Sequence, residues 1–159
     1  MVGLKKNWII IPFSENEAEH SACLHQKCFE DAWSVKSFKE LSRNICTFGF
    51  LAKDINDSKT KGLILGQLCQ SEAEIYTLAA HPSQRRQGIA TLLIENFIIL
   101  CLSQSIESIF IEVNENNAAA LIFYQNIGFV CYGKRPKYYV LSNNDFADAV
   151  LLQLKINKN

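Results

Sequence analysis

The 159-residue sequence lacks an excess of either charge and any long apolar run. Lys and Arg total 16 and Asp and Glu total 16, so the formal net charge is zero. A neutral chain argues against a general nucleic-acid binder and against a membrane-surface protein. The longest apolar run after the N-terminal segment, FIILCL, is too short to span a bilayer. We therefore expect neither nucleic acid nor a membrane as a partner.

Common phosphate and redox motifs are also absent. The sequence has no GxxxxGK[ST] and no GxGxxG segment, which disfavours a nucleoside-triphosphate or nicotinamide enzyme. It has six cysteines but no CxxC pair. Most of them sit in apolar runs, and 48% of the residues are hydrophobic, so a core can form without disulfides. We expect buried free thiols in a reducing cytoplasm. These cysteines are Cys23, Cys28, Cys46, Cys69, Cys101 and Cys131.

Two weaker signals do not change this interpretation. His20, Cys23, His25 and Cys28 gather in one predicted helix, but their spacing is not that of a helical zinc site, so no metal is expected. The N-terminal segment has lysines and a short apolar run, WIIIPF, but no small-residue cleavage site. We expect a cytoplasmic protein with one domain over residues 1–159.

Hydrophobic periodicity predicts an α+β (mixed α/β) fold with about seven strands, mostly antiparallel, and four helices. Three successive strand-like runs indicate an antiparallel meander. Ser34 and Asn117 are expected to cap helices, and Gly128 to end one. The expected helices cover 15–29, 34–42, 87–103 and 117–126, and the expected strands cover 8–13, 47–53, 62–69, 74–80, 108–113 and the segments FVCYGK and DAVLLQLKI.

The strand at 74–80, the helix at 87–103 and the strand at 108–113 form a predicted central βαβ unit, whose strands run parallel. Ligands of such units bind beyond the carboxyl ends of the strands, beside helix N-termini. The segment HPSQRRQGIATLLIENF, which begins at His81, lies at that place. Its arginines oppose the helix dipole unless an anion sits on the turn.

The turn from Arg85 to Thr91 has the chemistry of a phosphate site. Gly88 has no Cβ, so a ligand can approach the backbone, and Ala90 is also small. Free N–H groups of a first helical turn can point at a phosphate, and Arg85 and Arg86 can add charge-assisted hydrogen bonds. Pyrophosphate is the natural ligand of such a turn. An ordinary surface loop with exposed arginines explains the same residues equally well.

Two motifs give the chain a resemblance to a known family. Residues 85–90, Arg-Arg-Gln-Gly-Ile-Ala, resemble motif A of the GNAT N-acetyltransferase superfamily, Arg/Gln-x-x-Gly-x-Gly/Ala. Residues 112–129 contain E-V-x-x-x-N-x-x-A-x-x-x-Y-x-x-x-G-F, which resembles motif B. This string, with FEDAWSVKSF and KRPKYY, also resembles the RimI-type enzymes, which acetylate the N-terminal alanine of a small-subunit ribosomal protein. The resemblance implies a GNAT fold, acetyl-CoA as cosubstrate and a protein N-terminus as acceptor.

The resemblance also implies where acetyl-CoA binds. Backbone amides of the Gly88 turn hold the pyrophosphate, and the end of the preceding strand offers unpaired backbone groups to the pantetheine arm. Asn117 is expected to contact that arm while it caps its helix. The implied coenzyme-binding residues are Leu78, Ala79, Ala80, Arg85, Arg86, Gln87, Gly88, Ile89, Ala90, Thr91 and Asn117.

By the same resemblance, Glu112 acts as general base and Tyr124 as general acid. An α-amine has a pKa of about 7.7–8.0, so much of it is protonated at neutral pH and needs a base before it can attack. Tyr124 is expected to donate a proton to the CoA thiolate. Without the motif, Glu112 is a strand-end carboxylate that reaches water, and Tyr124 is a core tyrosine. A non-catalytic CoA-binding module, the alternative of a different class, would need neither residue.

Trp33, Tyr138 and Tyr139 are aromatic residues expected to wall the acceptor groove, although simple packing explains them equally well. The chain departs from the RimI-type pattern at Thr77, where asparagine is usual, and at His81, where an acid is usual. These departures leave other amine acceptors open, namely a lysine, a polyamine or an aminoglycoside.

Overall fold

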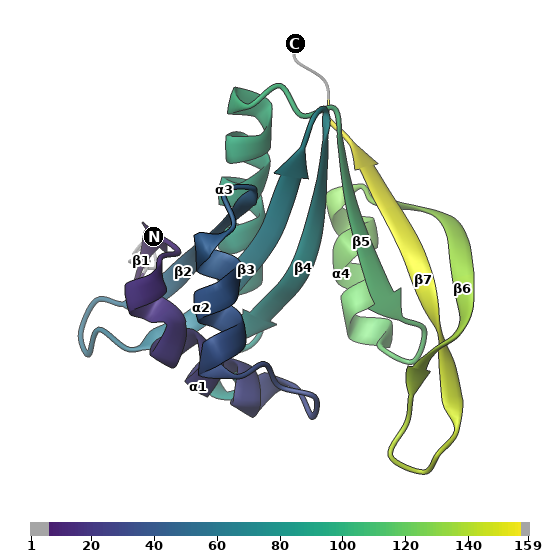
Figure 1. Ribbon diagram of the computed structural model, residues 1–159, viewed down its shortest axis with the longest axis horizontal. Coiled ribbons are helices and arrows are strands. Elements are labelled where there is room, and N and C mark those ends of the chain that lie inside the picture. Colours follow the sequence, from purple (N-terminus) through teal and green to yellow (C-terminus); the bar gives the residue numbers. More distant parts are fainter. Residues whose placement is uncertain (1–6, 157–159) are drawn as a thin grey trace, which may run out of the picture.

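One mixed sheet of seven strands, in the order β1-β2-β3-β4-β5-β7-β6, organises the computed structural model (Figure 1). The structure describes residues 7–156, which contain the predicted strands and helices. The strands are β1 (Trp8–Pro12), β2 (Thr47–Asp54), β3 (Thr60–Cys69), β4 (Glu72–Ala80), β5 (Ser108–Asn114), β6 (Val130–Val140) and β7 (Phe146–Lys155). The helices are α1 (Ala18–Cys28), α2 (Val35–Arg43), α3 (Ile89–Ser103) and α4 (Ala118–Ile127), with short 3-10 turns η1 (Glu15–Glu17) and η2 (Pro82–Gln84).

The strand pairing confirms the predicted topology. β1 to β4 form an antiparallel meander. β4 and β5 run parallel, with α3 between them in the sequence, so the central βαβ unit is present. β7 returns antiparallel to β5, and β6 pairs antiparallel with the outer side of β7.

Helices cover the two faces of the sheet unequally. α1 and α2 pack on one face of β2–β4, where Leu24 and Phe38 join a core cluster with Leu51. α3 and α4 lie on the opposite face, where Phe97 and Tyr124 belong to a larger cluster. In the described part of the chain, no helix covers β5, β7 and β6 on the α1 side (Figure 1). That surface of the sheet is therefore open to a ligand.

Capping residues set the ends of two helices where the sequence predicts them. The Ser34 side chain accepts a hydrogen bond from the Ser37 amide at 3.1 Å, at the start of α2. Asn117 accepts one from the Ala120 amide at 3.1 Å, at the start of α4. Gly128 ends α4 with a φ of 114°, a left-handed conformation that glycine adopts without a Cβ clash. All three capping predictions are confirmed.

The expectation that the cysteines are buried is wrong for most of them. All six are free thiols, but only Cys101 is buried, where burial raises its pKa to about 12. Cys131 shows the reason: it lies on the edge strand β6, where even its neighbour Val130 is 67% exposed. An apolar run in the sequence does not put every one of its members on a buried face.

β4 and β5 separate after their first four paired residues. Glu72–Ile75 pairs with Ser108–Ile111, and the pairing ends there. Figure 1 shows the two strands diverging toward their carboxyl ends. The divergence opens the sheet at the edge where βαβ units bind their ligands.

Candidate active site

The turn that precedes α3 has an open backbone. Arg86 and Gly88 both have left-handed backbone conformations, with φ values of 61° and 85°. Gly88 is the N-cap of α3 and makes no side-chain cap, and a Cβ built on it would meet no atom within 4 Å. The side chain of Ile89, 1% exposed, anchors the helix in the core. The first amides of α3 therefore have room for an anion.

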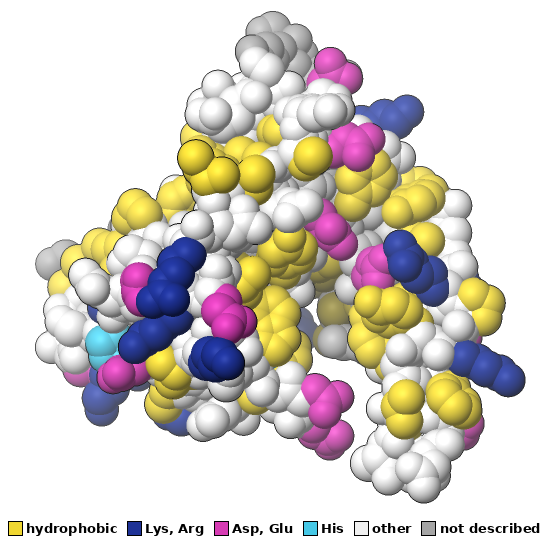
Figure 2. Space-filling view, in the orientation of Figure 1, with side chains coloured by type: hydrophobic (Ala, Val, Ile, Leu, Met, Phe, Trp, Pro, Cys, Tyr) yellow, Lys and Arg dark blue, Asp and Glu magenta, His cyan; other side chains and the backbone are white. Residues whose placement is uncertain are grey.

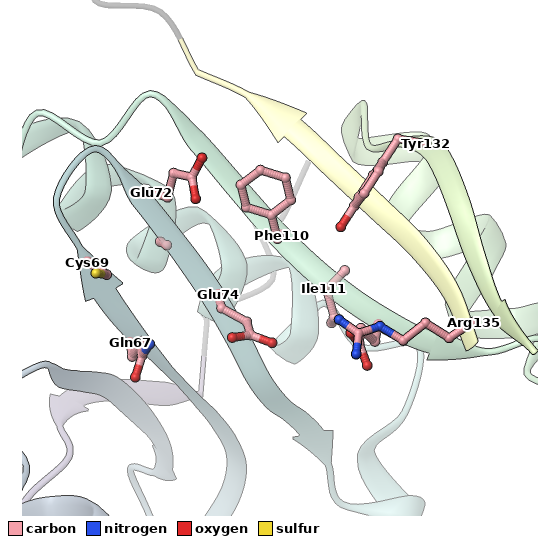
Figure 3. Close-up of a pocket in the computed structure, with 10 residues that line it drawn as sticks. Gln67, Cys69, Glu72, Glu74, Phe110, Ile111, Tyr132 and Arg135 are labelled. Carbon is pink, nitrogen blue, oxygen red and sulfur yellow. The ribbon is translucent and has the colours of Figure 1, made fainter. Parts of the chain in front are cut away.

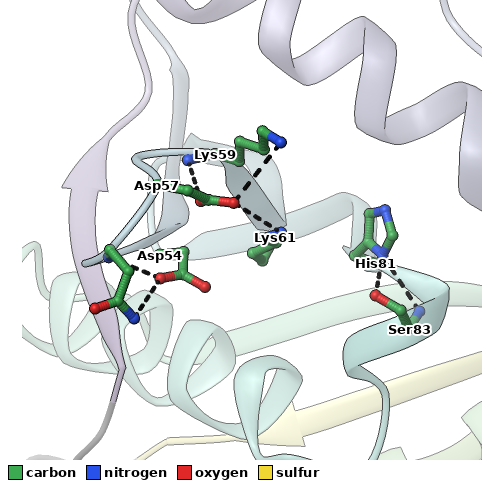
Figure 4. A network of polar contacts seen from close by, with 7 residues as sticks. Asp54, Asp57, Lys59, Lys61, His81 and Ser83 are labelled. Carbon is green, nitrogen blue, oxygen red and sulfur yellow. Dashed lines mark hydrogen bonds and ion pairs between the residues drawn. The ribbon is translucent and has the colours of Figure 1, made fainter.

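Local polar contacts hold the segment before this turn (Figure 4). His81 Nδ1 accepts a hydrogen bond from the Ser83 amide at 3.2 Å, and the His81 amide donates to the Lys61 carbonyl at 2.8 Å. Burial, together with the nearby charges of Lys27, Lys61 and Arg85, lowers the pKa of His81. His81 is therefore neutral near pH 7 and caps η2.

A cavity of about 690 Å³ opens between the separated ends of β4 and β5. Figure 2 shows the surface hollowed between the two parts of the sheet, β1–β4 on one side and β5, β7 and β6 on the other. Residues at the carboxyl-terminal halves of β4 and β5, at the start of α4 and in the segment between α1 and α2 all line it. Six of the predicted site residues are in its wall: Trp33, Leu78, Glu112, Asn117, Tyr124 and Tyr139.

The other predicted residues are not part of that wall. Ala79 and Ala80 complete β4, and residues 85–91 form the turn and the start of α3 beyond it. Tyr138 is 51% exposed and packs its ring against Tyr139, with 5.0 Å between the centroids. Tyr138 thus contacts the cavity only through its neighbour.

Glu112 lies between the large cavity and a smaller one of about 280 Å³, and it is in the wall of both. Its Oε1 forms an ion pair with Arg135 Nε at 3.0 Å, and its side chain is 21% exposed. Figure 3 shows Glu74 of β4 facing Arg135 across the smaller cavity. Burial and the charge of Glu112 raise the pKa of Glu74. In the described chain, Glu112 Oε2 has no such partner and remains available to a ligand.

Tyr124 is a buried polar group of the same cavity wall. It is 4% exposed, and its ring packs against Phe123 and Phe129 at centroid distances of 5.2 and 5.3 Å. Burial raises the pKa of its phenol above the ordinary value of 10, so it is protonated at neutral pH. No acceptor for the hydroxyl occurs among residues 7–156, so the O–H proton is free for a ligand.

Sequence reasoning missed Arg135 and His25. Arg135 reaches Glu112 across β7, because Arg135 pairs with Ala149 and Ala149 pairs with Asn114. No local signal in the sequence gives that register. The sequence suggests His25 only as a possible metal ligand. In the structure its side chain is 3% exposed and lines the cavity.

Residues 19–129 match the acetyltransferase (GNAT) family. The chain belongs to this family. It is therefore an N-acetyltransferase, and its seven-stranded sheet with four helices in the described residues is the GNAT fold. The predicted family, fold class and type of enzyme are confirmed. GNAT enzymes use acetyl-CoA as the acetyl donor.

Several relatives are similar over most of this GNAT chain. The [ribosomal protein bS18]-alanine N-acetyltransferase of Escherichia coli K12 is 28% identical over 135 residues, 84% of this chain and 88% of that protein. N-alpha-acetyltransferase 30 of Schizosaccharomyces pombe is 26% identical over 145 residues, 86% of this chain and 93% of that protein. The crystal structure of the Escherichia coli ribosomal-protein-S18-alanine N-acetyltransferase has a TM-score of 0.87 at 23% identity and covers 96% of both chains. Arabidopsis thaliana NAA60 in complex with acetyl-CoA has a TM-score of 0.82 at 17% identity and covers 95% of this chain and 99% of that one.

Residues 7–156 lack two further features. Within that range, no helix is both long enough and apolar enough to cross a membrane. The same range contains no group of three or more His, Cys, Asp and Glu side chains placed to hold a metal ion.

Proposed function

We propose that this enzyme transfers the acetyl group of acetyl-CoA to the N-terminal α-amine of a protein, namely the N-terminal alanine of a small-subunit ribosomal protein. One observation carries the proposal: the Glu112 carboxylate and the Tyr124 phenol line one cavity. A base and an acid on one cavity are what direct transfer from a thioester to an amine needs. The names of the Escherichia coli and Schizosaccharomyces pombe relatives support this acceptor class, and a ribosomal acceptor agrees with the expected cytoplasmic location.

Two features support the donor site. The open turn at Gly88 offers backbone amides and Arg85 and Arg86 to a diphosphate. Leu78–Ala80 pairs with β3 on one side but not with β5 on the other, so this edge has backbone groups outside the strand pairing that can meet the amides of the pantetheine arm. The Ala80 carbonyl also accepts a weak hydrogen bond from the Cys28 thiol at 3.4 Å. Asn117 lines the cavity, and we assign it a contact with the same arm.

Glu112 is the proposed general base. It takes one proton from the acceptor ammonium through a water molecule and leaves a neutral amine. Its ion pair with Arg135 fixes the carboxylate between the two cavities, where Oε2 can meet that water. The amine nitrogen then forms a bond to the thioester carbonyl carbon, and the carbon–sulfur bond breaks.

Tyr124 is the proposed general acid. Its phenol gives a proton to the departing sulfur, and the nitrogen's second proton restores the phenol through solvent. One ammonium and one thioester thus become one amide, one thiol and one proton. The acetyl group passes directly to the amine, so no cysteine carries it.

Trp33 and Tyr139 are the proposed aromatic walls of the acceptor groove. Both line the large cavity, Trp33 from the segment between α1 and α2 and Tyr139 from β6. Tyr138 supports Tyr139 by ring packing. Such walls fit the extended backbone of a peptide that enters from the open face of the sheet.

The test is acetylation of a peptide that begins Ala-Arg-Tyr-Phe by the purified enzyme, followed by thiol release and product mass. The matched control is the same peptide with a blocked α-amine, and the parallel acceptors are spermidine and a lysine amide whose α-amine is acetylated. We expect turnover of the free peptide and none of the blocked one. Turnover of spermidine or the lysine amide, with the free peptide left unmodified, would contradict the proposed acceptor.

A further inference from the structure

A β-bulge in β4 decides which way Thr77 faces. The pairing of β4 with β3 shifts register between Ile75 and Thr77, so Tyr76 is the extra residue. In a regular strand, Ile75 and Thr77 would share a face. Here Ile75 joins the core cluster with α3, whereas Thr77 contacts His25 of α1. The bulge therefore turns Thr77 to the α1 side of the sheet.

The contacts of His25 select one tautomer of its ring. The Trp33 amide donates a hydrogen bond to His25 Nδ1 at 3.1 Å, so that nitrogen carries a lone pair. Burial lowers the pKa of His25 to about 4, so the ring is neutral at pH 7 and its proton is on Nε2. Nε2 lies 3.2 Å from Thr77 Oγ1. His25 is therefore the donor in this contact, and Thr77 is the acceptor.

The Thr77 hydroxyl keeps its own proton for another partner. A hydroxyl can accept and donate at once, and the contact with His25 uses only a lone pair. Thr77 is 6% exposed, yet it lines the large cavity. The described residues provide no acceptor for its O–H. A carbonyl oxygen of a ligand in the cavity can therefore accept this proton and gain a hydrogen bond there.

The position of Thr77 favours the acceptor over the coenzyme. Its neighbour His25 stacks on Trp33, with 4.9 Å between the ring centroids, and both rings line the cavity on the α1 side. Leu78, the next residue, points to the opposite face and packs with the α3 cluster. The proposed coenzyme contacts at Gly88 and Asn117 lie at the starts of α3 and α4, which cover that opposite face, so the Thr77 hydroxyl lies in the acceptor part of the cavity.

We propose that Thr77 is a specificity-determining residue, whose hydroxyl donates a hydrogen bond to the first main-chain carbonyl of the acceptor peptide. His25 is a positioning residue. Its Nδ1 accepts a hydrogen bond from the Trp33 amide, and its Nε2–H donates one to Thr77 Oγ1 and so orients the hydroxyl. The inference rests on the proposed function, because a protein N-terminus carries a carbonyl group on the carbon that bears its amine. Polyamines have no such carbonyl, so Thr77 selects an amino-acid amine over a simple one.

Thr77→Val and Thr77→Ser make a matched pair for the test, since valine keeps the shape without the hydroxyl and serine keeps the hydroxyl. The acceptors are the Ala-Arg-Tyr-Phe peptide and the same peptide with an (E)-alkene in place of its first peptide bond. We expect T77V to raise the peptide KM about fivefold to tenfold with kcat little changed, and T77S to restore it. The alkene peptide should lose the same factor with the wild-type enzyme and nothing more with T77V.

The outcomes separate this inference from the function on which it rests. Wild-type turnover of the peptide with an unchanged KM in T77V would overturn the role of Thr77 alone. A fall in kcat without a change in KM would also overturn it, because the hydroxyl would then act on the thioester. A wild-type enzyme that acetylates small amines but no peptide would overturn both. For His25, nitrogen NMR should show the proton on Nε2, and a proton on Nδ1 would contradict the positioning role.

Discussion

Glu112 can serve two cavities because of its place on β5. Ile111 and Val113, on either side of it, are each 6% exposed and face the core, whereas Glu112 faces the open surface of the sheet. Arg135 satisfies one carboxylate oxygen there. A carboxylate that is ion-paired through one oxygen leaves the other oxygen open to a proton from a ligand.

Glu112→Gln tests this role because it keeps the size of the side chain and removes the base. We expect kcat/KM to fall about 10²- to 10⁴-fold at neutral pH, with CoA affinity unchanged. The loss should shrink at higher pH, where the α-amine is already deprotonated. Thiol release across a pH series measures both effects. Glu95→Gln, on the exposed side of α3, is the control, and an E112Q enzyme as fast as wild type would remove Glu112 from the mechanism.

Tyr124→Phe keeps the packed ring and removes the proposed acid. We expect kcat to fall about 10²-fold with little change in stability. Because burial raises the pKa of Tyr124 above 10, the wild-type enzyme should keep its acid form, and show no alkaline loss due to this group, at any pH below 10. Tyr132→Phe, at a ring that is 55% exposed, should leave kcat unchanged. A Y124F enzyme with wild-type kcat would assign the proton to another donor.

At the scale of helices and strands, periodicity and capping residues predict most of the fold. Ser34, Asn117 and Gly128 act as the sequence indicates because capping is local chemistry. The bulge at Tyr76 is not predictable in this way, because it exists only in the register between β4 and β3. β6 likewise extends through KRPKYYV to Val140, beyond the predicted FVCYGK, in an irregular pairing with β7.

The same distinction applies to the site. Glu112, Tyr124 and Asn117 lie close together in the sequence, in one strand and the following helix, so a motif can report them together. Arg135 and His25 reach the site through long-range packing, and no spacing in the sequence links them to it.

The packing of α1 on β4 makes stability depend on pH through His25. Burial lowers its pKa from 6.5 to about 4, so between these values the unfolded chain binds a proton that the folded chain does not. The free energy of unfolding should therefore be highest above pH 6.5 and fall toward pH 4, by at most about 3 kcal/mol from this group. Urea unfolding at several pH values measures the slope. His25→Gln should flatten it, and an unchanged slope in H25Q would contradict this origin.

At the scale of the whole molecule, two parts of the sheet are joined through four paired residues of β4 and β5. A ligand held in the gap contacts both parts. We expect CoA at 100 times its Kd to raise the free energy of unfolding by about 2.7 kcal/mol.

Hydrogen exchange should slow on CoA binding at Tyr76–Ala80 and Glu112–Asn114, the strand ends that border the gap. Protection that leaves both strand ends unaffected would contradict binding between them.

The measurement that tests the donor site most directly is calorimetric titration of CoA into the wild-type protein, Gly88→Ala and Gly88→Trp. Both replacements strain a residue with a φ of 85°, but only tryptophan fills the open space beside the backbone. We expect G88A to keep CoA binding within about tenfold and G88W to lose it, because the amides after Arg85 hold the diphosphate. CoA binding by G88W with wild-type affinity would contradict this site.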